Sequence, residues 1–271
     1  MIKGKTILIT GASSGLGRAL AIEFSRRENK LVLASRNEEE LIETARRCHC
    51  PSDSILVATT DVTREEDCER LVRSALEQFG RIDIVIANAG VSMWSRIDEL
   101  SSLDAIRRVM DVNYFGAVNT VFHALPHVIA SRGSIVAISS IQGKIPVPLH
   151  SGYVASKHAL QGYFNTLRME QKRSGLHVLL VLPHWILGTN LRRNSLDSAG
   201  IRTEHSPAQH TGESIELQAL CGKIMRAIET RKNEIIVPFK LRLLLWLSYL
   251  NPAAAERVVG RKLREQKRPV E

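Results

Sequence analysis

The sequence contains little cysteine, no long hydrophobic run and no long polar tract, and each absence excludes a class of protein. Four cysteines in 271 residues are too few to predict a disulfide framework. Cys48 and Cys50 form a C-x-C pair, which lacks the C-x-x-C spacing of common zinc sites, so no metal is expected. With 44% hydrophobic residues and no polar tract, the chain is expected to fold into a globular domain.

The sequence also lacks an apolar segment long enough to cross a bilayer. The run from Leu243 to Leu250 is too short and is flanked by charged residues. The N-terminal residues contain no hydrophobic region followed by a small-residue cleavage site, as a signal peptide would. We therefore expect a cytoplasmic protein, with its C-terminal region as a candidate for peripheral contact with the inner face of a membrane.

Positive charge is in excess but is unevenly distributed. The formal net charge is +9, and more than half of the excess lies between Phe239 and Glu271. No basic patch interleaved with aromatic residues occurs elsewhere, so nucleic acid is not an expected partner. Leu and Trp beside Lys and Arg in this tail suit a helix that lies on anionic lipid. The same residues could instead cap a substrate site or form a subunit contact.

Short apolar runs alternate with amphipathic stretches along most of the chain. Most of the apolar runs are nearly continuous in Ile, Leu and Val, as in parallel strands that are covered on both faces. The alternation predicts an α/β fold, namely a Rossmann-type doubly wound seven-stranded parallel sheet with helices on both faces. The predicted strands are Thr6–Thr10, Lys30–Ala34, Ser54–Thr59, Ile82–Ala87, Ser134–Ser139, Leu176–Leu182 and Glu234–Val237.

One domain is expected over residues 1–238, because nothing in the pattern requires a second. It includes a polar segment at about residues 190–214, which we expect to form a substrate loop. Residues 239–271 follow as an apolar and basic C-terminal extension.

Glycines follow the first predicted strand and precede a predicted helix. They let the backbone turn tightly and approach a pyrophosphate, while the helix N-terminus offers unpaired N–H groups to its charge. A glycine-rich turn without a ligand is the alternative, but the position after the first strand favours dinucleotide binding. The residues expected to surround the phosphates are Gly11, Ser13, Ser14, Gly15, Leu16 and Gly17.

The end of the second predicted strand contains no acidic residue. Sites that prefer NAD usually place an acid there to hold the ribose hydroxyls, whereas an Arg accommodates the 2′-phosphate of NADP. Here Ser35 and Arg36 occupy the position, and Arg36 could pair with a phosphate in a bidentate manner. Although Arg36 could simply face solvent, the missing acid favours NADP(H) as the cofactor.

Tyr153 and Lys157 are four residues apart, so they share a helix face. A nearby ammonium stabilises a phenolate and lowers the pKa of the tyrosine, as a proton donor to a substrate oxygen requires. The spacing alone is often coincidental. Ser140 follows a buried-looking strand, where its hydroxyl could orient a carbonyl oxygen beside a bound cofactor.

Together these residues resemble the short-chain dehydrogenase/reductase family, over about Lys3 to Val237. The shared motifs lie at their expected points in the strand–helix order: Thr10-Gly11-x-x-x-Gly15-x-Gly17, Asp61-Val62, Asn88-Ala89-Gly90, Asn113, Ser140 and Tyr153-x-x-x-Lys157. Residues around Ser35, Ser140 and Tyr153, with the apolar and basic tail, are similar to the subgroup that contains 11β-hydroxysteroid dehydrogenase and related membrane-associated reductases.

The resemblance implies roles for further residues. Asp61 and Val62 would contact the adenine, Asn88 with Ala89 and Gly90 would line the cofactor site, and Asn113 would help hold a water that relays protons to Lys157. Taken singly, Asp61 could be a helix cap, Asn88 a turn residue and Asn113 an ordinary buried amide.

The sequence departs from the family after the sixth predicted strand. Family members usually have Pro-Gly-x-Val-x-Thr, but here His184 replaces the glycine and one extra residue precedes Thr189. Pro183, Ile186 and Thr189 remain the candidates for contact with the nicotinamide. The departure leaves the local backbone and the efficiency of hydride transfer open.

These features predict an NADP(H)-dependent oxidoreductase that interconverts a carbonyl and an alcohol. The catalytic residues would be Asn113, Ser140, Tyr153 and Lys157. Apolar residues among 92–94, 141–150 and Trp185 would line a pocket for a lipid-like or steroid-like substrate, unless they are core or subunit contacts. The resemblance implies a homodimer or homotetramer. The alternative is a non-catalytic scaffold or sensor that binds NADP(H) and could also associate with a membrane.

Overall fold

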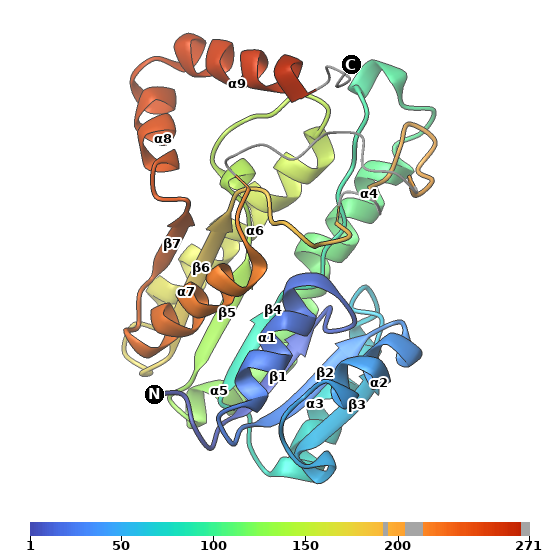
Figure 1. The fold of residues 1–271 in the computed structure, drawn as a ribbon, viewed down its shortest axis with the longest axis vertical. Helices are drawn as coiled ribbons and strands as arrows, with labels where there is room; N and C mark the ends of the chain where they lie inside the picture. The colour runs from blue at the N-terminus through green and yellow to red at the C-terminus, as the bar shows by residue number, and fades with distance from the viewer. Residues whose placement is uncertain (192–194, 204–213, 267–271) are drawn as a thin grey trace.

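The computed structural model describes residues 1–191, 195–203 and 214–266, and its centre is the predicted seven-stranded parallel sheet (Figure 1). The strand order is β3-β2-β1-β4-β5-β6-β7. The strands are β1 Thr6–Thr10, β2 Lys30–Ser35, β3 Ile55–Thr59, β4 Ile84–Ala87, β5 Ser134–Ile138, β6 His177–Pro183 and β7 Glu234–Val237. The α/β fold class is therefore confirmed.

The fourth strand begins two residues later than the sequence predicts. The side chain of Asp83, rather than a backbone carbonyl, accepts the Thr6 N–H at 3.0 Å. That carboxylate is 2% exposed and also accepts from Arg81 and Lys5. The Asp83 N–H still donates to the Thr6 carbonyl at 2.9 Å, but the regular residue pairing with β1 begins at Ile84.

Helices cover both faces of the sheet, as the uninterrupted apolar strands predict. In β1, Ile7 and Ile9 pack on one face with α1 Gly15–Ser25, α2 Glu38–Arg46 and α7 Leu217–Glu229. Leu8 packs on the other face with α3 Glu65–Phe79, α5 Gly116–Ala130 and α6 Ser151–Glu170. Because successive strand side chains point to opposite faces, a strand buried on both sides needs apolar residues at every position.

The sheet topology creates a crevice at the carboxyl ends of its strands. The chain moves outward from β1 through β2 to β3, and then crosses back to place β4 on the other side of β1. Such a reversal of strand order leaves a crevice in which doubly wound folds bind ligands. The segments that follow β1, β2, β4, β5 and β6 all begin at this edge, and they contain most of the predicted site residues.

Two helices follow the sheet at one end of the molecule, and the second turns away from the direction of the first (Figure 1). These are α8 Leu241–Leu250 and α9 Pro252–Gln266. Leu241 and Leu245 of α8 belong to the same hydrophobic core as the α6 face of the sheet, so the extension packs onto the domain. The predicted substrate loop at about 190–214 lies in large part outside the described residues. Among the helices of the described ranges, none is long and apolar enough to span a membrane.

Candidate active site

The glycine loop after β1 is packed against the end of β4. Gly11 has φ +66°, and a Cβ added there would lie 2.9 Å from the Ala89 Cα. A Cβ on Gly17 would collide with the Gly11 carbonyl oxygen. The Asn88 side-chain amide donates to the carbonyls of Thr10 at 2.9 Å and Gly11 at 3.2 Å. Asn88 therefore ties β4 to the glycine loop across the topological switch point.

The N-terminus of α1 is available to an anion. Ser14 is the cap residue, but its side chain makes no capping hydrogen bond to the first turn. The first N–H groups of a helix have no partner within the helix, and together they attract negative charge. Gly15 and Gly17, the first and third residues of the helix, add no side chains at this end. The geometry fits a cofactor pyrophosphate.

The ends of β2 and β3 place polar groups beside the glycine loop. The Ser35 hydroxyl donates to the Ser13 hydroxyl at 2.8 Å. Arg36 Nη1 lies 3.8 Å from Asp61 Oδ2, and the Arg36 side chain is 46% exposed. Asp61 also accepts from the Thr63 N–H at 3.1 Å, so it forms a local turn as well as facing Arg36. An exposed guanidinium next to Ser35 is a suitable partner for a phosphate.

Tyr153 and Lys157 lie one turn apart on α6, and both are almost completely buried. Lys157 Nζ is 5.6 Å from the centre of the Tyr153 ring. It donates to the carbonyl of Ile138, the last residue of β5, at 2.9 Å. The spacing in the sequence thus places the two groups together, and the hydrogen bond places both at the carboxyl edge of the sheet.

Burial decides the pKa values of this pair. Burial raises the pKa of Tyr153 to about 12, and a hydrogen bond with Ser140 acts in the opposite direction. Burial lowers the pKa of Lys157 to about 8. The sequence predicts a lowered pKa for Tyr153, and this is wrong for the structure as it stands, because desolvation of the phenolate outweighs its favourable contacts. Tyr153 is therefore a neutral phenol at neutral pH.

Asn113 lies in a π-helical turn, Asp111–Phe115, between α4 Asp104–Met110 and α5. Its side-chain oxygen accepts from the Val91 N–H at 2.8 Å, and its amide donates to the Val91 carbonyl and the Ser156 hydroxyl, both at 2.9 Å. A Cβ on Gly90 would lie 3.2 Å from the Asn113 oxygen. The side chain of Asn113 thus joins the segment after β4 to the helix of Tyr153 and Lys157.

The segment after β5 holds Ser140 at the start of a short 3₁₀ turn. The Ser140 hydroxyl oxygen accepts from the Gln142 N–H at 3.1 Å. Gln161 of α6 donates to the Ser139 hydroxyl at 3.0 Å and to the Ser140 carbonyl at 3.1 Å. Sequence reasoning missed Gln161, although a signal was present: it is four residues beyond Lys157 and shares its helix face. The buried Gln161 amide fixes the backbone of Ser140 to α6.

The atypical segment after β6 turns back toward the glycine loop. His184 continues the pairing of β6, because its N–H donates to the Val237 carbonyl at 2.8 Å. Gly188 adopts φ +73°, a left-handed conformation that suits glycine and accommodates the extra residue. A Cβ on Gly15 would lie 3.4 Å from the Thr189 Cβ, so Thr189 packs over the glycine loop. Thr189 therefore lies at the glycine loop, whereas Ile186 packs against the core on the α1 and α7 face of the sheet.

A cavity of about 300 Å³ lies beside the Ser140 turn and extends beneath α8 and α9. Four residues from the predicted substrate pocket line it: Ile141, Ile145, Val147 and Trp185. Met93, also predicted there, is instead completely buried in the core, where its sulfur accepts from the Gly152 N–H at 3.1 Å. Met93 therefore supports the N-terminal end of α6.

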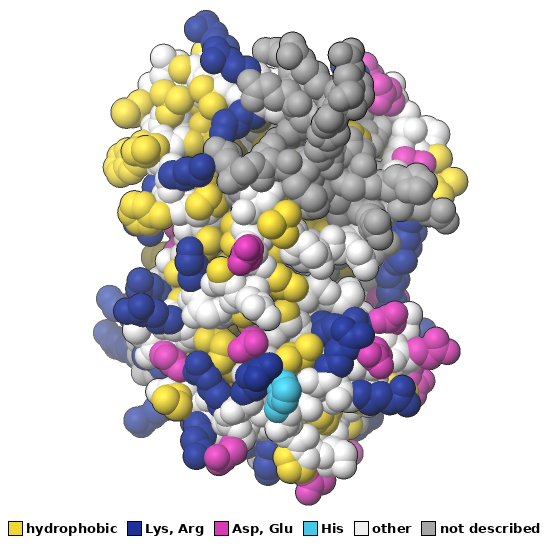
Figure 2. Space-filling view, in the orientation of Figure 1, with side chains coloured by type: hydrophobic (Ala, Val, Ile, Leu, Met, Phe, Trp, Pro, Cys, Tyr) yellow, Lys and Arg dark blue, Asp and Glu magenta, His cyan; other side chains and the backbone are white. Residues whose placement is uncertain are grey.

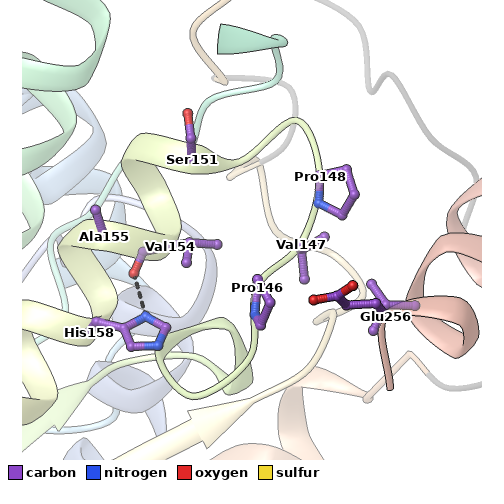
Figure 3. A pocket seen from close by; sticks show the side chains of 9 residues that line it. Pro146, Val147, Pro148, Ser151, Val154, Ala155, His158 and Glu256 are labelled. Carbon is purple, nitrogen blue, oxygen red and sulfur yellow. Dashed lines mark hydrogen bonds between the residues drawn. The ribbon is translucent and has the colours of Figure 1, made fainter. Parts of the chain in front are cut away.

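A second, larger hollow of about 750 Å³ lies on the other side of the Pro146–Pro148 segment (Figure 3). Val154, Ala155 and His158 of α6 line it, with Glu256 of α9. The His158 ring contacts the Val154 carbonyl at 2.9 Å. Val147 and Val259 border both hollows, so the Pro146–Pro148 segment separates them. Among the described residues, no group of side chains is arranged to hold a metal ion.

Comparisons with known proteins agree with this geometry. A family model described as short chain dehydrogenase matches residues 5–199. The chain is 37% identical to a dehydrogenase/reductase SDR family protein 7-like of Anopheles gambiae, over 93% of this chain and 81% of that protein. It is 33% identical to 11-beta-hydroxysteroid dehydrogenase A of Sesamum indicum, over 94% and 74% respectively. A Burkholderia phymatum short chain dehydrogenase/reductase in complex with NAD superposes with a TM-score of 0.81 at 25% identity, over 94% of this chain and 96% of that one.

We predict that Lys157→Met stabilises the protein at neutral pH by about 1–3 kcal/mol, because it removes a buried ammonium and loses one hydrogen bond. Burial lowers the Lys157 pKa from 10.5 to about 8, so between these values the unfolded chain binds more protons than the folded chain. Wild-type stability should therefore rise with pH across this window, and the advantage of the variant should shrink.

Urea unfolding of both proteins at several pH values across this window measures the difference. Lys172→Met, at an exposed position just beyond α6, is the control and should change stability little at any pH. A stability difference between Lys157→Met and wild type that does not vary with pH would contradict the assignment.

Proposed function

Because the chain belongs to the short-chain dehydrogenases/reductases, in the subgroup of the 11β-hydroxysteroid dehydrogenase-like proteins, we propose that it is an NADP(H)-dependent enzyme that interconverts a hydrophobic ketone and its alcohol. The observation that carries the proposal is the buried group of Ser140, Tyr153 and Lys157 at the carboxyl edge of the sheet. The glycine loop and the N-terminus of α1 lie at the same edge and fit a dinucleotide.

In this mechanism, NADPH when bound supplies the hydride that adds to the carbonyl carbon. The Ser140 hydroxyl donates a hydrogen bond to the carbonyl oxygen and orients it. Tyr153 then transfers its phenolic proton to that oxygen as negative charge develops. A phenol that remains protonated at neutral pH is suited to this donor role. In the oxidative direction the same groups act in reverse.

Lys157 would position and assist Tyr153. Its ammonium lies close to the phenol ring and would stabilise the phenolate formed when the proton leaves. Its own pKa of about 8 makes it able to exchange a proton near neutral pH, so it can return one to Tyr153. The Asn113 side chain is fully engaged with Val91 and Ser156, which supports a role in holding this machinery together. The water-relay role implied by the family stays a proposal.

Tyr153→Phe should reduce the turnover of NADPH with hydrophobic ketones by about 10²–10⁴-fold, because it removes the proton donor and leaves the ring in place. NADPH affinity, measured by fluorescence titration, should change little. Tyr163→Phe is the matched control, since Tyr163 lies on the same helix outside the proposed site.

Turnover retained in Tyr153→Phe would contradict the mechanism. A wild-type protein that binds NADPH but oxidises none of a panel of hydrophobic ketones would instead support the alternative, a non-catalytic scaffold or sensor.

The choice of NADP(H) rests on Arg36 and on the absence of an acid at the end of β2. The Burkholderia phymatum relative was solved with NAD, so the family alone does not decide between the two cofactors. In this chain Arg36 is half exposed and lies beside the Ser35–Ser13 hydroxyl pair. A 2′-phosphate there would accept charge-assisted hydrogen bonds from the guanidinium.

Arg36→Leu should weaken NADPH binding by about 10- to 100-fold and leave NADH binding nearly unchanged, because hydrogen bonds to a charged phosphate contribute about 1.5–3 kcal/mol. Calorimetric titration with both cofactors measures the ratio. Arg73→Leu, an exposed arginine on α3, is the control. Equal losses for the two cofactors would contradict the assignment of Arg36 to the phosphate.

Peripheral membrane association is supported by the surface of α8. Figure 2 shows hydrophobic side chains gathered over this helix beside Lys and Arg. Trp246 is 66% exposed, Tyr249 70% and Leu250 80%, and the Arg242 guanidinium lies 4.6 Å from the Phe239 ring centre. Exposed apolar patches of this kind mark interaction sites, and the adjacent basic groups favour anionic lipid.

We expect the full chain to float with vesicles that contain phosphatidylserine, and the double substitution Leu243→Ser with Trp246→Ser to abolish flotation. Binding should weaken at high salt, because charge attraction contributes to it. Leu103→Ser, at an exposed leucine far from α8 in the chain, should bind as wild type. If the double variant changes the oligomeric mass while flotation persists, the patch is a subunit contact. The homodimer or homotetramer implied by the family remains a proposal, supported by the exposed Phe122 of α5.

A further inference from the structure

Polar side chains also line the cavity beneath α8 and α9, and the mechanism uses none of them: Gln142, His184, Lys240 and Lys262. Gln142 lines this cavity and is only 6% exposed. Its side-chain oxygen is buried and, within the part of the chain that the structure describes, accepts no hydrogen bond. A buried amide without a partner is costly in folding free energy, and such groups commonly await a water or a ligand.

The walls around this amide are mainly apolar. Ile141 and Ile145 come from the Ser140 turn, and Leu241 and Leu244 come from α8. The volume of about 300 Å³ is at the lower end of the range for small-molecule sites. A mainly apolar cavity with a few convergent polar groups is the usual composition of a site for a mostly hydrophobic molecule.

The position of Gln142 links this cavity to the reacting group. Its backbone N–H donates to the Ser140 hydroxyl at 3.1 Å, while its side chain lines the cavity. Gln161 holds the same turn against α6 through the Ser140 carbonyl. The amide is therefore held in a fixed relation to Ser140, and could select a second polar group at a set position on a substrate.

We propose that the cavity beneath α8 and α9 binds the apolar body of the substrate and that the Gln142 amide hydrogen-bonds to a second polar group on it. This rests on the proposed function and extends it to a substrate class. The ligand is a compact, largely apolar ketone or alcohol that carries one further hydroxyl or carbonyl group. A hydroxyl suits the site because it can both donate to and accept from the amide.

Helix α8 has apolar side chains both toward the cavity and on its exposed surface. Leu241 and Leu244 face the cavity, while Trp246 and Tyr249 are exposed on the same helix. Leu243 is 73% exposed and still contributes to the cavity wall, so the apolar surface of the protein continues into the site.

The test measures equilibrium binding to the full chain by calorimetry without added cofactor, so that neither the ketone nor the hydroxylated probes are converted. The probes are androstanone, a rigid saturated tetracyclic ketone, and a panel of its monohydroxylated isomers. At least one isomer should bind wild type about 10-fold more tightly than the parent ketone. Gln142→Leu, which is similar in size, should remove this preference and leave the affinity for the parent ketone nearly unchanged, since one hydrogen bond is lost.

A second variant tests the site independently of the amide. Leu244→Trp places a large ring in the cavity and should weaken every tetracyclic probe by at least about 10-fold, because the added bulk occupies the ligand's volume. Leu250→Trp makes the same change at an exposed position of the same helix and should bind as wild type. Thermal unfolding identifies any variant that fails to fold.

Unchanged binding of the probes to Leu244→Trp would overturn the site. The role of the amide would be overturned if wild type preferred no hydroxylated isomer over the parent ketone, or if Gln142→Leu kept that preference. These outcomes are separable from failure of the proposed function. If only the proposed function fails, the binding preference for a hydroxylated isomer would persist, but the protein would reduce no ketone. That includes cyclohexanone, a small ketone that does not require the cavity.

Discussion

A buried lysine constrains the arrangement of the catalytic half of this molecule. Removing an ammonium from water is expensive, and the protein offsets part of that cost with the Ile138 carbonyl at the end of β5. The Lys157 side chain can reach that carbonyl only if α6 lies directly over the carboxyl edge of the sheet. The same placement brings Tyr153 to the edge where a cofactor would lie.

The remaining contacts can be understood as supports for this placement. Asn113 connects the segment after β4 to α6 through Val91 and Ser156, and Gln161 connects α6 to the segment after β5. Asn88 makes the equivalent connection between β4 and the glycine loop. Three side-chain amides, two of them buried, thus join segments that are distant in the sequence. An amide is suited to this work because it donates and accepts at once without introducing a charge.

The turn that begins at Ser140 serves two parts of the molecule. On one side it presents the hydroxyl that lies beside Tyr153, and on the other it forms the inner wall of the cavity beneath α8 and α9. The C-terminal helices α8 and α9 therefore contribute a wall to a proposed substrate site, and α8 adds an exposed apolar surface to the exterior. Leu241 and Leu245 belong to the main core, and their packing holds α8 against the domain beside the cavity.

The sequence by itself determined the fold class, six of the seven strands to within about one residue at each end, and the location of the glycine loop, because these depend on local periodicity and on residues adjacent in the chain. It also placed Tyr153 and Lys157 on one helix face. Only the tertiary structure decided the raised pKa of Tyr153. It alone also showed the core position of Met93, the linking role of Gln161 and the unpartnered amide of Gln142. Desolvation and hydrogen bonding at these positions depend on segments that meet only after folding, and no local pattern records which of them will be neighbours.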